Sequence, residues 1–170
     1  SASATIDFTS DIDDTYDEYV FKFIDIHPSA DEAGVNLGFN LSIDSGSNYN
    51  VTKTSSHWRA YHHEDLGYYS VEYDGDPIHL AESTSVQIIA ENVGADNDQS
   101  CAGTLRLFSP ADTTFAKHYI ASFNVVTHAD FCVKQHLAGY GNTTSAVDAI
   151  QFSYSSGNID AGSISMYGIS

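Results

Sequence analysis

The feature that most constrains this chain is an unbroken alternation of apolar and polar residues over residues 35–43. Its odd positions hold Val, Leu, Phe, Leu and Ile, and its even positions hold Asn, Gly, Asn and Ser. Side chains of a β-strand point to opposite faces at every second residue, so this pattern predicts a strand with one face in a core. Because such a face is stable only under other elements, the chain has to build a sheet around it.

The last stretch of the chain has the same alternation on both sides of a turn. In residues 149–154 Ile, Phe and Tyr alternate with Gln and Ser, and in residues 163–167 Ile and Met alternate with Ser and Tyr. Residues 155–162 between them are rich in Ser, Gly, Asn and Asp, which favour turns. The pattern predicts a β-hairpin at this end of the chain.

Further strands are indicated by alternation or by β-branched and aromatic runs between polar turns. Residues 16–27 carry such residues on both faces, which suits a central strand. The remaining predicted strands are residues 4–8, 49–61, 68–73, 86–90, 103–108, 115–127 and 131–140. The sequence contains no amphipathic helix pattern, so the chain is predicted to be all-β and to form one domain over residues 1–170. The predicted architecture is an antiparallel β-sandwich of about ten strands, with a jelly roll as the favoured version.

The charge balance is strongly acidic, with 23 Asp and Glu against 6 Lys and Arg and a formal net charge of −17. Nucleic acid and anionic membranes are therefore not expected partners, since both attract basic surfaces. No run of about eighteen apolar residues is present, so membrane insertion is not expected either. The acidic residues form either a solvated surface or sites for divalent cations.

Two places are weak candidates for a metal site. His62 and Glu64 would share one side of a strand, but a histidine site normally needs three or four converging ligands. Asp96 and Asp98 lie in a turn-rich stretch whose oxygens could bind Ca²⁺. Residues 11–14 and 74–76 are similar acidic clusters, and none has the spacing of an EF-hand. No cofactor is predicted, with Ca²⁺ as the open option.

Aromatic residues gather around the least regular part of the sequence, residues 62–80. They could stack on sugar rings or anchor a protein interface, or else form an edge of the core. The predicted interaction residues are Trp58, Tyr61, Tyr68, Tyr69 and Tyr73.

No motif for catalysis stands out. The chain lacks a Gly-x-Ser-x-Gly nucleophile elbow and a phosphate-binding glycine loop, and its many acids permit carboxylate pairs without specifying one. The chain is therefore predicted not to be an enzyme. Cys101 and Cys132 are the only cysteines, and they are either two half-buried thiols or a disulfide between neighbouring strands.

Five stretches of the sequence carry a resemblance to a family. They are residues 15–21 (TYDEYVF), 26–29 (IHPS), 94–99 (GADNDQ), 107–120 (LFSPADTTFAKHYI) and 155–169 (SSGNIDAGSISMYGI). In this order and wording they resemble small virion structural proteins of marine tailed bacteriophages, of the capsid-decoration or fibre type. The resemblance implies a place in a virion, and it brings no catalytic or binding residues with it.

Three hypotheses follow. The first is a non-enzymatic virion protein, assembled in the bacterial cytoplasm and displayed on the capsid exterior as a decoration or head-fibre subunit. The alternative is a tail-fibre tip that recognises a carbohydrate or another surface, and the third is a glycan hydrolase. The chain is expected to bind further copies of itself as a homotrimer, by analogy with other virion sandwiches. The other expected partner is the major capsid protein or another virion protein, and a host surface glycan is a further candidate.

Overall fold

The structure is a computed structural model that describes residues 2–65, 67–73 and 78–170. These residues form eleven β-strands in two sheets, and every strand pair is antiparallel. Among them there is no helix of the length and hydropathy that a membrane crossing requires. The strands are β1 (Thr5–Phe8), β2 (Glu18–Pro28), β3 (Leu37–Ser42), β4 (Lys53–His63), β5 (Tyr69–Tyr73), β6 (Gln87–Ala90), β7 (Cys101–Phe108), β8 (Lys117–Val126), β9 (Phe131–Gly141), β10 (Ala149–Tyr154) and β11 (Ile159–Ile169).

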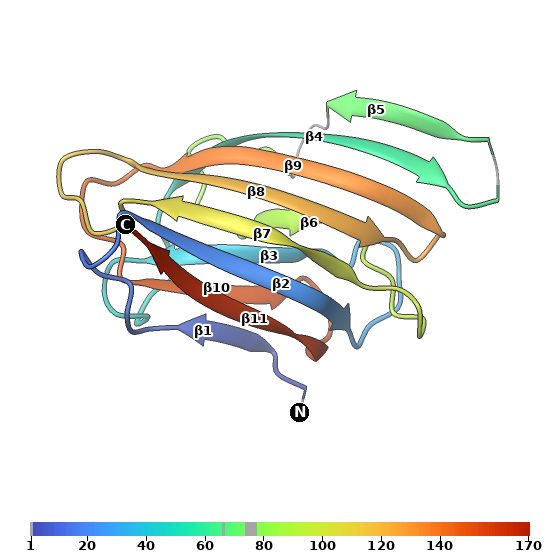
Figure 1. The fold of residues 1–170 in the computed structure, drawn as a ribbon, viewed down its shortest axis with the longest axis horizontal. Helices are drawn as coiled ribbons and strands as arrows, with labels where there is room; N and C mark the ends of the chain where they lie inside the picture. Colours follow the sequence, from blue (N-terminus) through green and yellow to red (C-terminus); the bar gives the residue numbers. More distant parts are fainter. Residues whose placement is uncertain (1, 66, 74–77) are drawn as a thin grey trace.

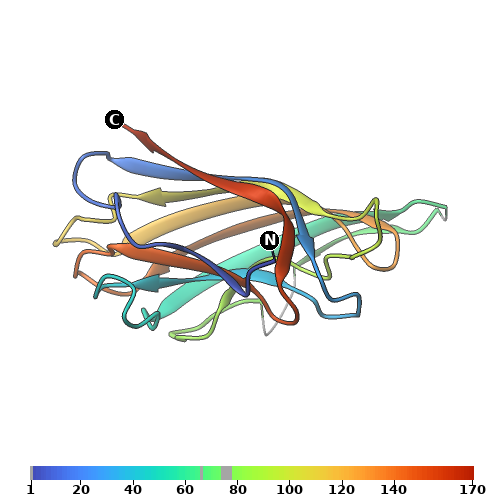
Figure 2. The ribbon, with the colours of Figure 1, turned by 90° about the horizontal axis from the view of Figure 1, so that it is seen from below.

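The two sheets are of unequal size. The smaller has the order β1-β10-β3-β6, and the larger has the order β11-β2-β7-β8-β9-β4-β5. Figure 1 looks onto the larger sheet, with β3 and β6 behind it, and Figure 2 shows the molecule turned by 90°. The predicted antiparallel β-sandwich is thus confirmed. A jelly roll is built of eight strands in two Greek keys, so the eleven-stranded arrangement leaves that part of the prediction unconfirmed.

Aromatic rings from both sheets form the centre of the core. Phe152 of β10 lies with its ring centroid 5.4 Å from that of Phe21 and 5.0 Å from that of Phe23, both on β2. Phe39 of β3 packs on Tyr119 of β8 at 5.1 Å. Burying each of these side chains stabilises the fold by about 1.5–3 kcal/mol, so this group holds the two sheets together.

The predicted C-terminal hairpin is wrong. β10 pairs with β1 and β3 in the smaller sheet, whereas β11 pairs with β2 at the edge of the larger one. The turn at residues 155–158 therefore carries the chain from one sheet to the other. Alternation reports which face of a strand is buried, but it does not report which sheet the strand joins.

A bulge disturbs the pairing of β2 and β11. Asp25 has a φ of 49° and Gly162 opposite has a φ of 95°, and the register shifts at both. A Cβ atom on Gly162 would lie 2.4 Å from the carbonyl oxygen of Asp25, so only glycine fits there. The bulge leaves Ile24 exposed and Ile26 buried. β2 lies between β11 and β7, as predicted for a central strand, but its outer face is only partly covered.

Candidate functional site

The β4–β5 hairpin ends the larger sheet, and both views show it reaching past the other strands (Figures 1 and 2). Its register places Arg59 opposite Glu72, and Trp58 opposite Tyr73. Because neighbouring residues of a strand point to opposite faces, Arg59 and Glu72 point inward and Trp58 and Tyr73 point outward. The hairpin therefore presents two different surfaces.

The five predicted interaction aromatics all lie on this hairpin or next to it, but they do not form one cluster. Tyr61 and Tyr68 line a pocket on the inner side. Trp58, Tyr69 and Tyr73 belong to the outer face and are exposed. The pattern of residues 62–80 is too irregular to predict which way each side chain points, so the sequence does not separate the two sets.

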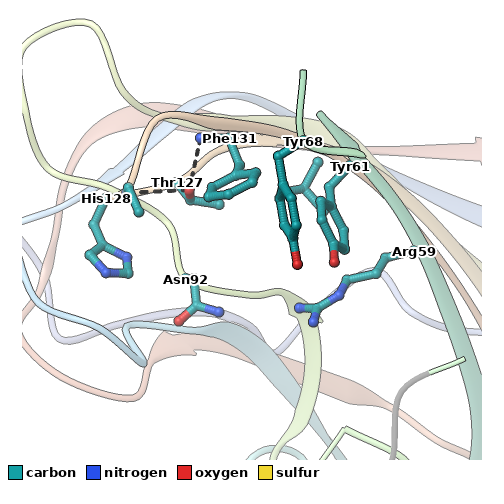
Figure 3. A pocket seen from close by; sticks show the side chains of 9 residues that line it. Arg59, Tyr61, Tyr68, Asn92, Thr127, His128 and Phe131 are labelled. Atoms are coloured by element: carbon teal, nitrogen blue, oxygen red, sulfur yellow. Dashed lines mark hydrogen bonds between the residues drawn. The ribbon is translucent and has the colours of Figure 1, made fainter. Parts of the chain in front are cut away.

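The inner pocket has a volume of about 230 Å³ (Figure 3). One wall is aromatic: the ring centroids of Tyr61 and Tyr68 are 6.1 Å apart, and Phe131 packs edge-on against Tyr61 at 5.6 Å and Tyr68 at 6.2 Å. Phe131 comes from β9, which pairs with β4 so that Phe131 lies opposite His63. No local pattern in the sequence indicates Phe131 as a pocket residue, because this pairing joins segments far apart in the chain.

Arg59 forms the charged side of the pocket. Its Nη1 donates to Glu91 Oε2 and its Nη2 to Glu72 Oε2, each at 3.0 Å. The Tyr61 hydroxyl donates to Glu72 Oε1 at 2.6 Å, and this bond raises the pKa of Tyr61 to about 12. The same bond, with the one from Arg59, lowers the pKa of Glu72. The guanidinium is thus balanced by two carboxylates, and the group carries no excess positive charge.

Asn92 and His128 lie across the pocket from the aromatic wall (Figure 3). Asn92 Oδ1 accepts from the Gly34 amide at 2.9 Å, which turns the amide nitrogen of its side chain toward the cavity. The turn that carries His128 is fixed by Thr127, whose Oγ1 accepts from the Phe131 amide at 3.1 Å. These bonds fix the polar side of the pocket through Asn92 Oδ1 and Thr127 Oγ1, so the Nδ2 of Asn92 and the imidazole of His128 are left to face the cavity.

The outer face of the hairpin carries stacked aromatic pairs. Trp58 stacks on His136 at 4.4 Å, and Tyr69 lies parallel to His62 at 5.9 Å. Tyr69, Val71 and Tyr73 are each 72% exposed. We call Trp58, Tyr69, Val71 and Tyr73 the outer patch.

Within the described residues, none of the predicted metal candidates comes together with enough further ligands for a metal site. His62 is committed to its stack with Tyr69, and Glu64 lies in the following turn, where its amide donates to the carbonyl of Asp130. Asp96 closes a turn in which its carbonyl accepts from the Gln99 amide at 2.9 Å.

No group of three or more His, Cys, Asp or Glu that could hold a metal ion occurs in the described part of the chain. Within the acidic stretch of residues 11–14, Asp13 Oδ1 accepts from the Thr15 amide and from the Tyr19 hydroxyl, both at 2.9 Å. The cluster at residues 74–76 lies outside the described residues.

The two cysteines are free thiols in different settings, so the disulfide alternative is wrong. Cys101 is buried in the core and Cys132 is exposed on the outer face of β9. Neither is half-buried, because β7 turns Cys101 inward while β9 turns Cys132 outward. Burial raises the pKa of Cys101 to about 12.

Comparisons with family models, with curated proteins and with solved structures find no match to this chain. The inner pocket and the outer patch are therefore the features from which its function is inferred.

Proposed function

We propose that this chain is a non-enzymatic structural module on the exterior of a phage capsid, as a decoration or head-fibre subunit. The observation that carries the proposal is the outer patch, an exposed group of large apolar side chains on a protein of net charge −17. Monomeric proteins rarely expose contiguous large apolar groups without a partner, and aromatic residues are enriched in interfaces. The resemblance to small virion proteins supports a virion as the setting.

The position of the outer patch supports contact with another protein. β5 is the last strand of its sheet, so its outer edge offers backbone groups for a further strand. Glu72, the one charged residue of β5, points inward to Arg59, so the patch itself carries no charge. The partners in this proposal are the major capsid protein or another virion protein, and further copies of the chain in a homotrimer.

Immunogold labelling of intact virions with an antibody against this chain tests the location. Gold over the capsid shell is the expected result. Gold confined to the tail would refute capsid display and favour a receptor-binding tip instead.

The role of the outer patch is tested by Val71→Glu, which places a charge at an exposed position of β5. Ile24→Glu is the matched control, since Ile24 is 55% exposed on the outer side of β2 in the same sheet. Val71→Glu should abolish co-sedimentation with capsids that lack the protein, and Ile24→Glu should not. Light scattering should give three times the 18.4 kDa mass of the chain for the wild type and a smaller mass for Val71→Glu. Equal behaviour of the two variants would contradict the proposal.

A further inference from the structure

The inner pocket is open and preformed, and the proposed capsid contact does not use it. Tyr68 is 58% exposed, although Tyr61 and Phe131 hold its ring in place. A tyrosine at the edge of a core would be covered by its neighbours, whereas this ring presents one face to the cavity (Figure 3). An exposed, fixed aromatic face at a concave site is a binding surface that loses little conformational entropy when it is filled.

The size of the pocket limits the ligand to about one ring. Its volume of about 230 Å³ lies below the roughly 300–1,000 Å³ of sites for drug-sized molecules. The walls also require an amphipathic ligand, because aromatic rings form one side while Asn92 and His128 face them from the other. A pyranose ring meets both conditions, since its C–H groups form an apolar face and its hydroxyls project from the rim.

The charges around the pocket decide between sugars. The guanidinium of Arg59 is already paired with Glu72 and Glu91, so it is not open to a carboxylate or sulfate of a ligand. The whole molecule carries −17, which repels anionic sugars at a distance. Uncharged sugars experience neither effect.

We propose that the inner pocket binds one uncharged pyranose ring, which stacks on Tyr68 and directs its hydroxyls toward the Nδ2 of Asn92 and the imidazole of His128. This function goes beyond the proposed capsid display and does not depend on it, since the pocket and the outer patch lie on opposite faces of the hairpin. A chain displayed on a particle could thus contact glycans while its outer patch is occupied.

Titration of the isotope-labelled full chain with methyl glycosides of glucose, galactose and mannose, followed by NMR, tests the proposal. At least one glycoside should shift amide signals of residues 59–61, 68, 92 and 127–131 and leave those of β1 and β10 unchanged. N-acetylneuraminic acid, a carboxylated sugar, should bind at least about tenfold more weakly than that glycoside. No shifts with any glycoside up to about 50 mM, or tighter binding of the anionic sugar, would overturn the proposal.

Tyr68 and Tyr69 form a matched pair of variants, because they are neighbours in the chain and point to opposite faces. Tyr68→Ala should weaken glycoside binding at least about tenfold, while Tyr69→Ala should change it less than about twofold. Both side chains are exposed, so neither substitution endangers folding. Equal effects of the two variants would refute stacking on Tyr68.

Asn92→Asp tests the polar side of the pocket. It keeps the Oδ1 that accepts from the Gly34 amide and removes the Nδ2 donor, so binding should weaken while thermal stability is retained. Unchanged binding would overturn the assigned role of Asn92. Capsid co-sedimentation of the Tyr68→Ala chain separates the two proposals: it should equal that of the wild type even when sugar binding is lost.

Discussion

A buried lysine gives the sharpest prediction about stability. Lys53 at the start of β4 is fully buried, and its Nζ donates to Asn40 Oδ1 at 2.6 Å and to the carbonyl of Val51 at 3.0 Å. No carboxylate pairs with it among the described residues. Burial lowers the pKa of Lys53 from 10.5 to about 8. At pH 7 the fold therefore holds an ammonium group whose burial is costly.

The lowered pKa of Lys53 sets the size and the sign of its contribution to the free energy of unfolding. The pKa of Lys53 differs by about 2.5 between the unfolded and the native state, which corresponds to a destabilisation of the fold by roughly 3 kcal/mol at pH 7. Between pH 8 and 10.5 the native state binds fewer protons than the unfolded chain, so stability rises with pH in that window. Near pH 10 tyrosines oppose this trend, because burial raises the pKa of Tyr49 to about 12 in the fold. The buried thiol of Cys101 opposes the trend from about pH 9, because burial raises its pKa from 9.0 to about 12. The effect of Lys53 is therefore cleanest between pH 8 and 9.

Lys53→Met replaces the ammonium with an apolar group of similar length. The variant gains up to roughly 3 kcal/mol and loses two hydrogen bonds of about 1 kcal/mol each. We expect a net stabilisation of up to about 1 kcal/mol at pH 7, which raises Tm by about 2–4 °C. The variant's free energy of unfolding should also rise less with pH between 8 and 9 than that of the wild type.

Urea unfolding followed by circular dichroism at several pH values measures both effects. Lys134→Met is the control, because Lys134 is exposed on the outer face of β9. It should leave the pH dependence of the wild type unchanged. A Lys53→Met chain that is less stable than the wild type at pH 7, and that keeps the wild-type rise above pH 8, would refute the reasoning.

Three further predictions concern other buried or strained positions. Burial lowers the pKa of His57 from 6.5 to about 4, so the native state binds fewer protons than the unfolded chain between these pH values. As pH falls through this range, the free energy of unfolding therefore drops by up to roughly 3 kcal/mol, and His57→Leu should remove this drop in urea unfolding. Gly162→Ala should lower the free energy of unfolding by about 3 kcal/mol, because residue 162 combines a φ of 95° with a clash against Asp25. Gly34→Ala has a φ of 88° but open space around it, so it should cost about 1 kcal/mol in the same assay, and equal losses would contradict the clash. A thiol-reactive chromophore should label Cys132 alone in the native protein and Cys101 as well in denaturant, and two labels on the native protein would contradict the burial of Cys101.

The faces of the strands could be predicted from the sequence where the alternation is regular. Residues 35–43 contain β3, in which Leu37, Phe39 and Leu41 are in the core, but Ile43 lies beyond the strand and is exposed. Residues 115–127 contain β8, in which Tyr119, Ala121 and Phe123 are buried. The alternation does not predict the faces of β2 beyond the bulge at Asp25, because one added residue reverses which side chains face the core. Local patterns also carry no information on sheet membership, which is why β10 and β11 were wrongly joined in a hairpin.

The candidate site could be predicted only in part. The aromatic content of residues 58–73 indicated a surface of interest, and two of its tyrosines do line the inner pocket. Other lining residues come from the loop after β6, from the turn before β9 and from β9 itself; they include Asn92, His128 and Phe131. Only the pairing of β9 with β4 and the packing of one sheet on the other bring these segments together.

The inner pocket and the outer patch share one support. β5 pairs with β4 and with no other strand among the described residues, and the ion pair of Arg59 with Glu72 joins the two strands on their inner side. Arg59 also reaches Glu91, just beyond β6, and so ties the hairpin to the smaller sheet. Because this residue fixes the position of β5, it holds the wall of the pocket and the side chains of the outer patch at the same time. The aromatic residues can therefore be changed one face at a time, whereas a loss of Arg59 would disturb both proposed functions together.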